Sequence, residues 1–329
     1  MAQTRSIGVL VPTNGSTPTV PPHERPIGRA ALQLLERGID VVFGDRVSGG
    51  KVSGFRVAEN RWIEANHVSV VGFHDRFPSQ IRAEPFRKIQ AELCGIPMGN
   101  SLVFTMLCRD KVAAQRHFES RGIRMPPVEV DPTRFHTAIK TWQSAFLKPR
   151  YGALGIGVRR VKQGDSLPTH TAGVVENRPD PTILQAAISP PKGWASQTVR
   201  VLIQRTPQGG WFYGTPVVRR SQTDPVANAA RGAEVAAGPD VLSSPILIRI
   251  EQEVRLICAA LETMEEAHHM VEAGIDLVLD QDFEPWLIEI NSRPRGRMEV
   301  LASSNPRNYH AAHVDACARP LEVIAQWES

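Results

Sequence analysis

The sequence has few cysteines, few aromatic residues and no long apolar run. Its four cysteines, at positions 94, 108, 258 and 317, form neither a Cys-x-x-Cys pair nor a compact disulfide framework, so we expect reduced, mostly buried thiols. Nowhere do about 18 apolar residues follow one another, as a membrane-spanning helix would require. The apolar stretch at residues 7–11 is too short for the core of a signal peptide. We therefore expect a cytoplasmic protein with no membrane partner.

The basic residues do not form a patch for nucleic acid either. Lysine and arginine number 38 against 34 acidic residues, and no basic run exceeds the pairs at 159–160 and 219–220. Aromatic residues make up 6% of the chain and are scattered along it. Because nucleic-acid binding of this kind needs a basic stripe with interleaved aromatic residues, no nucleic-acid partner is expected.

Several familiar catalytic motifs are also missing. The sequence contains no Gly-x-Ser-x-Gly elbow and no His-Glu-x-x-His helix, so the hydrolases and zinc proteases that use them are not supported. Residues 44–52 resemble a phosphate loop, but the lysine is displaced by one position and no serine or threonine follows it. We interpret this stretch as a hairpin turn.

The first 108 residues alternate apolar runs with a helical stretch, which predicts an open α/β unit. Strands are expected at 7–11, 41–43, 68–73 and 102–107, and a helix at 28–38. Five prolines make residues 12–26 an irregular loop, which either covers a site or is a plain surface loop. The pattern changes near residue 109, where we place a domain boundary.

The remainder divides near Pro190 into two further units, residues 109–189 and 190–329. In the first, helices are expected at 111–121 and 132–143, and strands at 145–149, 157–161 and 182–188. In the second, we expect a long helix at about 245–274 and strands at 198–204, 211–219, 275–280 and 286–291.

A glycine-rich hairpin follows the strand that carries Lys148. Gly152, Gly155 and Gly157 come within ten residues of this lysine, and a second strand begins at once. Such a hairpin can fold its backbone N–H groups over phosphates while the lysine neutralises them. A purely structural hairpin is the alternative, since glycine-rich turns are common.

A second hairpin carries three oxygen-bearing side chains. Asp276 begins one strand, while Glu289 and Asn291 lie two residues apart on the next and therefore share a face. Together they suit a hard cation, and Mg²⁺ held with nucleotide phosphates is the expected occupant. The alternative is a solvent-facing edge, but the apolar neighbours indicate a buried strand whose acids need a partner.

One arginine lies in the middle of an apolar strand. Arg200 is flanked by valines, an unfavourable place for a charge unless it faces an anion. A surface salt bridge is the alternative.

In these motifs the sequence resembles the ATP-grasp superfamily, especially its D-alanine ligase, glutathione synthetase and spore-coat-associated branches. Residues 105–300 carry the resemblance through four segments in the family's order: Asp110-Lys111, the Lys148 strand with its glycines, residues 184–188, and Asp276 with Glu289 to Asn291. It implies an α/β ATP-grasp fold with an N-terminal pre-ATP-grasp, Rossmann-like domain at 1–108. Residues 109–189 would be the lid, and 190–329 the large subdomain with the metal site.

The resemblance also implies roles for individual residues. Arg219 or Arg220, with Asn228, would sense phosphate beside Arg200, and Arg293 and Arg295 would bind a substrate carboxylate. Mg²⁺ would be held by Asp276, Glu289 and Asn291. ATP would be bound by Lys111, Lys148, Gly152, Gly155, Gly157 and the hinge residues Gln185, Ala186, Ala187 and Ile188.

The implied activity is that of an ATP-dependent carboxylate–amine, or carboxylate–thiol, ligase. ATP would yield ADP and phosphate through an acyl phosphate, with ATP and Mg²⁺ as cofactors. The other hypothesis is a catalytically silent ATP-binding module of the same fold that serves in regulation or assembly. The substrates would be small molecules or peptides that the sequence does not identify, and fold analogy favours a homodimer.

Overall fold

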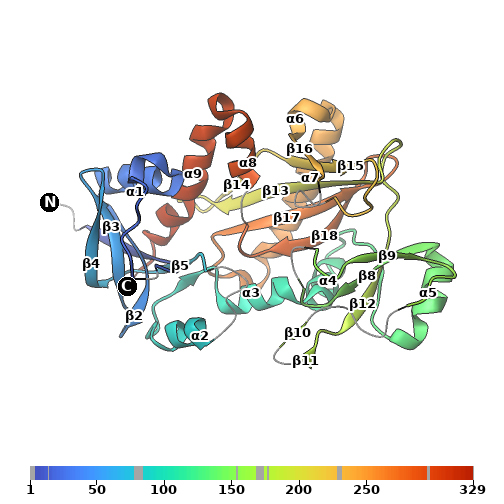
Figure 1. Cartoon of the computed structure of the whole chain (residues 1–329), viewed down its shortest axis with the longest axis horizontal. Helices are drawn as coiled ribbons and strands as arrows, with labels where there is room; N and C mark the ends of the chain where they lie inside the picture. The colour runs from blue at the N-terminus through green and yellow to red at the C-terminus, as the bar shows by residue number, and fades with distance from the viewer. Residues whose placement is uncertain are drawn as a thin grey trace.

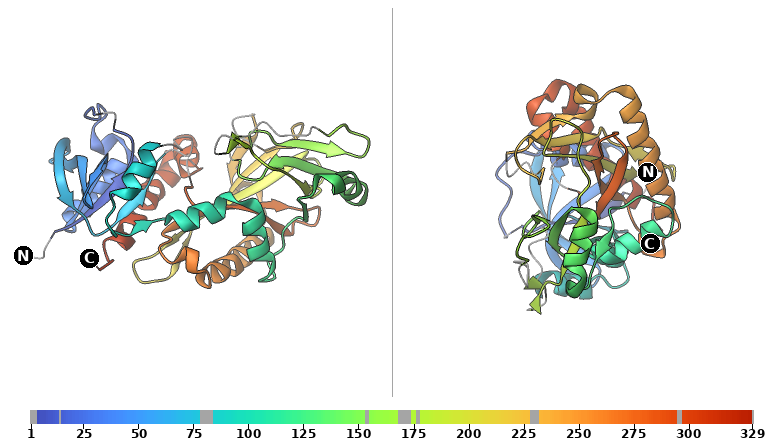
Figure 2. Two further views of the ribbon diagram at one scale, coloured as in Figure 1. Left: turned by 90° about the horizontal axis from the view of Figure 1, so that it is seen from below. Right: turned by 90° about the vertical axis from the view of Figure 1, so that its right-hand side faces the viewer.

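The computed structural model describes residues 4–13, 15–77, 84–152, 155–167, 174–175, 178–227, 232–294 and 297–328. Its three larger sheets follow one another along the chain. The N-terminal sheet lies at one end of the molecule, and the other two lie one above the other at the opposite end (Figure 1). The molecule is elongated, and both termini lie at the end formed by the N-terminal unit (Figure 2). None of the helices in the described ranges is long and apolar enough to cross a membrane.

The N-terminal sheet has the strand order β4-β3-β2-β1-β5-β6. Strand β1 lies in parallel between β2 and β5, whereas β2, β3 and β4 form antiparallel hairpins. The turn predicted within residues 44–52 is the one between β2 and β3. The elements of this unit are β1 (Arg5–Leu10), a 3-10 helix (Pro22–Glu24), α1 (Pro26–Glu36), β2 (Ile39–Ser48), β3 (Lys51–Ala58), β4 (Arg61–Ser69), β5 (Phe73–Asp75), α2 (Glu84–Ala91) and β6 (Met98–Gly99).

The strand predicted at 102–107 is wrong, because this segment is helix α3 (Leu102–Arg109). Ser101 begins the helix, since its side chain accepts a hydrogen bond from the backbone N–H of Phe104. A short apolar run has no periodicity that separates a strand from a helix, and the capping residue decided the outcome. All four cysteines are free thiols, as predicted. Cys258 is buried and Cys108 and Cys317 are half-buried, so the expected burial is wrong only for Cys94, which is exposed.

The small sheet has the order β7-β12-β8-β9, and all of its strand pairs are antiparallel. Helix α5 packs on one face through Phe135 and Ile139, which contact Ala145 and Leu147 of β8. Because side chains alternate along a strand, Phe146 and Lys148 point to the other face. The elements are α4 (Lys111–Glu119), β7 (Val128–Glu129), a 3-10 helix (Pro132–Arg134), α5 (Phe135–Trp142), β8 (Ser144–Pro149), β9 (Arg159–Lys162), β10 (Val174–Val175), β11 (Arg178–Pro179) and β12 (Thr182–Ala186).

The large sheet has the order β16-β15-β13-β17-β18, and β14 pairs with β13. Its apolar face packs on α7 through alternate residues of β13 and β17, including Val199, Val201 and Ile275. The other face therefore carries the polar residues of the same strands. The elements are β13 (Ser196–Arg205), β14 (Trp211–Tyr213), β15 (Val217–Ser221), β16 (Glu234–Ala237), α6 (Gly238–Val241), α7 (Ser244–Glu262), a 3-10 helix (Glu265–Ala267), β17 (Glu272–Leu279), β18 (Pro285–Asn291), α8 (Arg297–Ser304) and α9 (Pro306–Ile324).

The long helix predicted at 245–274 is too long, since α7 ends at Glu262 and β17 already begins at Glu272. The intervening residues form a short 3-10 turn whose apolar side chains join the core under the sheet. Sequence periodicity did not show this break, because apolar residues continue through both elements.

The last helix returns to the N-terminal unit. Val314 and Leu321 of α9 pack in one cluster with Ile7 of β1 and Leu34 of α1. In Figure 1, α9 lies between α1 and the large sheet. The C-terminal helix thus joins the cores of the first and last units and sets how the two meet.

Candidate nucleotide and metal site

The candidate site lies on the face of the large sheet that is turned away from α7. Arg200 on β13, Asp276 on β17 and Glu289 on β18 stand in one row across three neighbouring strands. Arg219 on β15 shares this face, because its register partner is Thr198, two residues from Arg200. Strand alternation and register thus gather two arginines and two carboxylates on one side of the sheet.

Asp276 lies at the centre of this row and accepts four hydrogen bonds. Its Oδ1 accepts from Arg200 Nε (2.6 Å) and Arg219 Nη2 (3.0 Å). Its Oδ2 accepts from Arg200 Nη2 and from Asn291 Nδ2, the latter at 3.1 Å. An ionised carboxylate offers about four lone-pair positions, so all of them are used. Burial alone would raise the pKa of Asp276, but the two guanidinium groups outweigh it and lower the pKa to about 2.

Glu289 and Asn291 share the face with Asp276 and complete a set of oxygen-bearing side chains. Asn291 Nδ2 lies 3.4 Å from Glu289 Oε1. Carboxylate and amide oxygens are ligands that Mg²⁺ accepts, so this donor set fits the cation. The described ranges hold no group of three or more His, Cys, Asp or Glu suited to a metal. A cation here would therefore take further oxygens from a bound nucleotide, as Mg²⁺ commonly does.

Lys148 faces this row from the small sheet. Its Nζ donates a 2.6 Å hydrogen bond to Oε1 of Gln185 on the neighbouring strand β12, and both side chains are buried. Burial and the nearby Lys111 lower the pKa of Lys148 to about 7, while the carboxylate of Glu289 opposes them. Because Glu289 lies close enough to raise the pKa of Lys148, the polar faces of the two sheets are turned toward each other.

Lys111 is the first residue of α4 and lies beside the glycine-rich hairpin. Its Nζ donates to the carbonyl oxygens of Arg150 (3.4 Å) and Gly152. Burial lowers its pKa, and the Glu289 carboxylate acts in the opposite direction. The preceding Asp110 caps α4 and binds Arg150 through two hydrogen bonds of 2.7 and 2.6 Å, so the start of the helix and the hairpin are tied together.

Two glycines of the hairpin have backbone conformations that favour glycine. Gly155 and Gly157 have φ angles of 70° and 73°, a region that costs other residues conformational energy. At Gly152 a Cβ atom would meet the ring of Pro149 at 2.8 Å. All three glycines are thus required by local geometry, whichever role the hairpin has.

The expected hinge residues already use part of their bonding capacity within the protein. The backbone N–H of Ala186 donates to Pro127 (2.9 Å) and that of Ala187 to Ser144 (3.0 Å). The Gln185 side chain is bound to Lys148. Of the N–H groups predicted to contact adenine, that of Ile188 makes no backbone hydrogen bond to any described residue.

The remaining predicted residues fall in different places. Arg220 lies on the opposite face from Arg219, where it binds Glu234 and stacks on Trp194, 4.4 Å from its ring centre. Arg293 forms an ion pair with Asp75 at 3.3 Å and thus ties the loop after β18 to the N-terminal unit. Asn228 and Arg295 lie outside the described residues.

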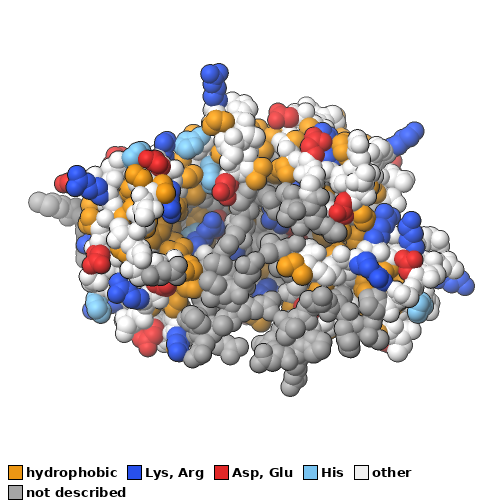
Figure 3. All heavy atoms as spheres, viewed as in Figure 1, with side chains coloured by type: hydrophobic (Ala, Val, Ile, Leu, Met, Phe, Trp, Pro, Cys, Tyr) orange, Lys and Arg blue, Asp and Glu red, His pale blue; other side chains and the backbone are white. Residues whose placement is uncertain are grey.

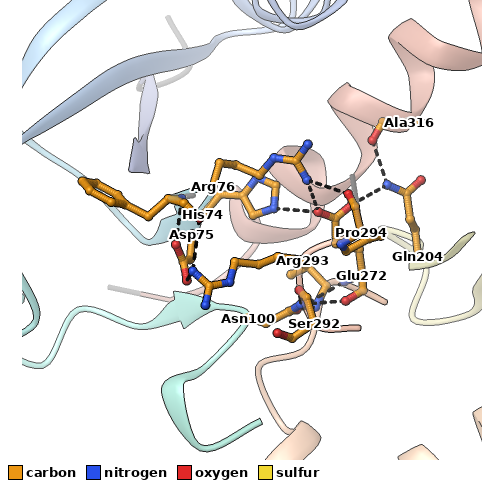
Figure 4. A network of polar contacts seen from close by, with 12 residues as sticks. His74, Asp75, Arg76, Asn100, Gln204, Glu272, Ser292, Arg293, Pro294 and Ala316 are labelled. Carbon is orange, nitrogen blue, oxygen red and sulfur yellow. Dashed lines mark hydrogen bonds and ion pairs between the residues drawn. The ribbon is translucent and has the colours of Figure 1, made fainter. Parts of the chain in front are cut away.

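A buried polar network, not predicted from the sequence, surrounds Glu272 (Figure 4). The Glu272 carboxylate accepts from Arg76 Nη1 (2.6 Å), His74 Nε2 (3.2 Å) and Gln204 Nε2 (3.1 Å). Burial opposes its ionisation, yet Arg76 and His74 lower the pKa of Glu272 to about 2. The sequence spacing could have indicated this residue, because Glu272 lies four positions before Asp276 and therefore on the same face of the strand.

Comparisons with known proteins support the same fold. A family model described as YheC/D like ATP-grasp matches residues 126–314. No curated protein sequence matches the chain significantly. At these low identities the following structural likenesses concern the fold, and they confirm the predicted α/β architecture. One similar solved structure is VanG D-Ala:D-Ser ligase from Enterococcus faecalis, with a TM-score of 0.58 and 14% sequence identity over 98% of this chain and 100% of that chain. D-alanyl-alanine synthetase A from Vibrio cholerae has a TM-score of 0.53 and 13% identity over 97% of this chain and 99% of that chain. L-amino acid ligase from Bacillus licheniformis has a TM-score of 0.56 and 14% identity over 99% of this chain and 75% of that chain.

Proposed function

Because the chain belongs to the YheC/D like ATP-grasp family, we propose that it is an ATP-dependent ligase that joins a carboxylate to an amine through an acyl phosphate. The convergence of Lys111 and Lys148 on the row of Arg200, Asp276 and Glu289 is the observation that carries the proposal. Together with Arg219, these two lysines and Arg200 make four basic side chains around the oxygen ligands, an arrangement that suits a triphosphate and its magnesium ion. The similar structures include a D-Ala:D-Ser ligase and an L-amino acid ligase, which supports the same reaction class.

In the proposed reaction, the substrate carboxylate attacks the γ-phosphorus of ATP, and ADP leaves. An amine then attacks the acyl carbon of the acyl phosphate and displaces phosphate. Lys111 and Lys148 would bind and orient the phosphates, and Arg200 and Arg219 would stabilise the charge on the transferring group. Each arginine keeps an Nη1 group that makes no hydrogen bond within the described ranges, so both have a donor to offer. Glu289 and Asn291 would hold Mg²⁺, which neutralises phosphate charge, and Asp276 would join them once Arg200 or Arg219 turns from it to the phosphates.

In this scheme the three units have separate tasks. Residues 109–189 would act as the lid over the nucleotide, and residues 190–329 would hold the metal and the phosphate-binding arginines. Residues 1–108 would help to bind the acceptor, because the network at Glu272 ties their sheet to the strand that carries Asp276.

A direct test is the release of ADP and phosphate from ATP with pooled amino acids and short peptides. Acyl phosphate chemistry predicts ADP as the product, and ¹⁸O from the substrate carboxylate should appear in the phosphate. AMP and pyrophosphate would instead indicate adenylation and contradict the mechanism.

One observation favours a second candidate, an ATP-binding module without turnover. Asp276 is fully engaged by two arginines and Asn291, so it offers no free lone pair to a cation in this conformation. Under this hypothesis ADP and ATP bind, but no carboxylate stimulates phosphate release. The same assay, combined with nucleotide titration, separates the two functions.

A further inference from the structure

The N-terminal sheet has a topological switch point beside the Glu272 network. The chain reaches β2 on one side of β1 and β5 on the other, and all three strands run parallel. In open α/β sheets, ligands bind outside the carboxyl ends of the strands at such a point. His74, Asp75 and Arg76 lie at the carboxyl end of β5. Basic side chains are visible near the centre of the molecule in Figure 3, between the N-terminal unit and the other sheets.

Arg76 uses one nitrogen within the protein and leaves a bidentate edge unused. Its Nη1 donates to Glu272 Oε1 at 2.6 Å and lies 3.4 Å from the carbonyl oxygen of Pro294. Its Nε and Nη2 make no hydrogen bond in the described part of the chain, and the side chain is 31% exposed. The Nε–Nη2 edge of arginine matches the two oxygens of a carboxylate.

The partner of Arg76 is held rigidly, so the position of the guanidinium is set before any ligand binds. Glu272 also accepts from His74 and Gln204, and its side chain is only 5% exposed. Asn100 fixes the backbone of Glu272 from both sides, because Nδ2 donates to its carbonyl (2.6 Å) and Oδ1 accepts from its N–H (3.3 Å). Figure 4 shows these groups around Glu272. A donor positioned in this way loses little conformational entropy when it binds an anion.

The partner of Arg76, Glu272, lies on the same face of β17 as Asp276 in the candidate phosphate site. Glu272, Gly274 and Asp276 alternate along β17, so the partners of Arg76 and Arg200 are four residues apart, or roughly 13 Å. Gly274, between them, carries no side chain, and a Cβ there would lie 3.1 Å from Pro294 and 3.7 Å from the Arg200 side chain. An extended chain of about four residues covers this distance, so it suits a short peptide, or an amino acid lined up behind the carboxylate substrate, between the transferred phosphoryl group and Arg76.

We propose that Arg76 binds a carboxylate that takes no part in the reaction, carried by an amino acid or short peptide that serves as the amine substrate. The inference rests on the proposed ligase function and adds to it the class of the amine substrate. It requires that the substrate keep a free carboxylate, and that replacing this carboxylate by a neutral amide weaken binding.

The test compares acids with their amides. The full-length protein, with ADP and Mg²⁺ present, is titrated calorimetrically with the proteinogenic amino acids, D-alanine and their homodipeptides, each paired with its carboxamide. We expect at least one acid to bind about 10- to 100-fold more tightly than its amide, the range for charge-assisted hydrogen bonds. Phosphoethanolamine carries a phosphate in place of the carboxylate and can also meet the bidentate edge of arginine, but it is expected to bind more weakly than the best acid.

The variant Arg76→Gln should reduce the preference for the acid to less than about threefold while leaving ADP binding unchanged. Arg56→Gln is the matched control, since Arg56 is also a partly exposed arginine of this sheet (38%) that binds a buried carboxylate, that of Asp40, at 3.1 Å. It should keep the full preference. The acid–amide comparison on the unaltered protein needs no variant and holds even if Arg76→Gln does not fold.

The inference is wrong if no acid of the panel binds more tightly than its amide, if the preference persists in Arg76→Gln, or if phosphoethanolamine binds as tightly as the best acid. ADP titration and phosphate release report on the proposed function separately. Normal ADP binding and turnover without an acid preference would overturn only the role of Arg76. Absence of ADP binding would instead overturn the proposed function.

Discussion

The charge of Lys148 is expected to make nucleotide binding dependent on pH. Burial and the neighbouring Lys111 lower its pKa from the ordinary 10.5 to about 7. A bound phosphate favours the ammonium form, so nucleotide binding should raise this pKa again. The affinity for ADP should therefore be constant below about pH 7, where Lys148 is already charged, and should fall as the pH rises above this value.

The size of the effect follows from the pKa. Each pKa unit corresponds to about 1.4 kcal/mol, so restoring the ordinary value on binding corresponds to roughly 5 kcal/mol. As long as the pKa in the complex stays above the experimental pH, the dissociation constant for ADP should rise about tenfold per pH unit. Between pH 7.5 and 9 we expect a loss of roughly 30-fold, or about 2 kcal/mol. The terminal phosphate of ADP, like a phosphate monoester, has its second pKa at about 6, so the ligand itself stays ionised over this interval.

Calorimetric titration of the full-length protein with ADP between pH 6.5 and 9 measures this dependence. Lys148→Met removes the titrating group and should give a weaker but pH-independent dissociation constant over pH 7.5–9. Lys140→Met, an exposed lysine on α5 of the same unit, is the matched control and should keep the slope of the unaltered protein. A flat profile in the unaltered protein, or the same slope in Lys148→Met, would refute the assignment of Lys148 to the phosphates.

Three further predictions concern other parts of the molecule. The pKa of Glu272 is about 2 in the folded protein and 4.5 ordinarily, so its contribution to stability, roughly 3 kcal/mol, should be complete above pH 4.5 and lost as the pH falls toward 2. Glu272→Gln should lower the melting temperature at pH 7 and flatten the dependence of stability on acid pH. An unchanged acid profile in this variant would argue against the network. Glu289→Gln should leave the fold intact but abolish Mg²⁺-dependent turnover and weaken Mn²⁺ binding in the nucleotide complex, measured by electron paramagnetic resonance; normal turnover would contradict its role as a ligand. Gly155→Val places a side chain at a φ of 70°, so the melting temperature should fall moderately in either case; if the hairpin covers the phosphates, the KM for ATP should also rise or kcat fall, whereas a loss of stability with normal kinetics would favour a purely structural hairpin.

Local sequence features determined much of the fold. Asp110 begins α4 because an aspartate can accept hydrogen bonds from the first free N–H groups of a helix. The alternation of polar and apolar residues in β13 and β17 determined which residues face α7 and which face the site. The two-residue spacing of Glu289 and Asn291 likewise placed both on one face. These features depend on neighbours within a few residues, so they can be read without the tertiary structure.

Local patterns were insufficient where short apolar runs were ambiguous. Residues 102–107 are equally compatible with a buried strand and with one side of a helix, and Ser101 decided for the helix. The predicted strand at 211–219 is interrupted, because the N–H of Gly214 binds the carbonyl of Leu202 and separates β14 from β15.

The site itself required the tertiary structure, because its contacts join residues that are distant in the chain. Strand register decides which of Arg219 and Arg220 faces the site. Because Arg219 pairs with Thr198, its side chain points toward Asp276, whereas the side chain of Arg220 points to the other face and binds Glu234. Arg76 and Glu272 are 196 residues apart and meet only because their two units pack together. The sequence by itself determined which side chains each strand face offers, and only the packing of sheets and helices decided which of these side chains meet.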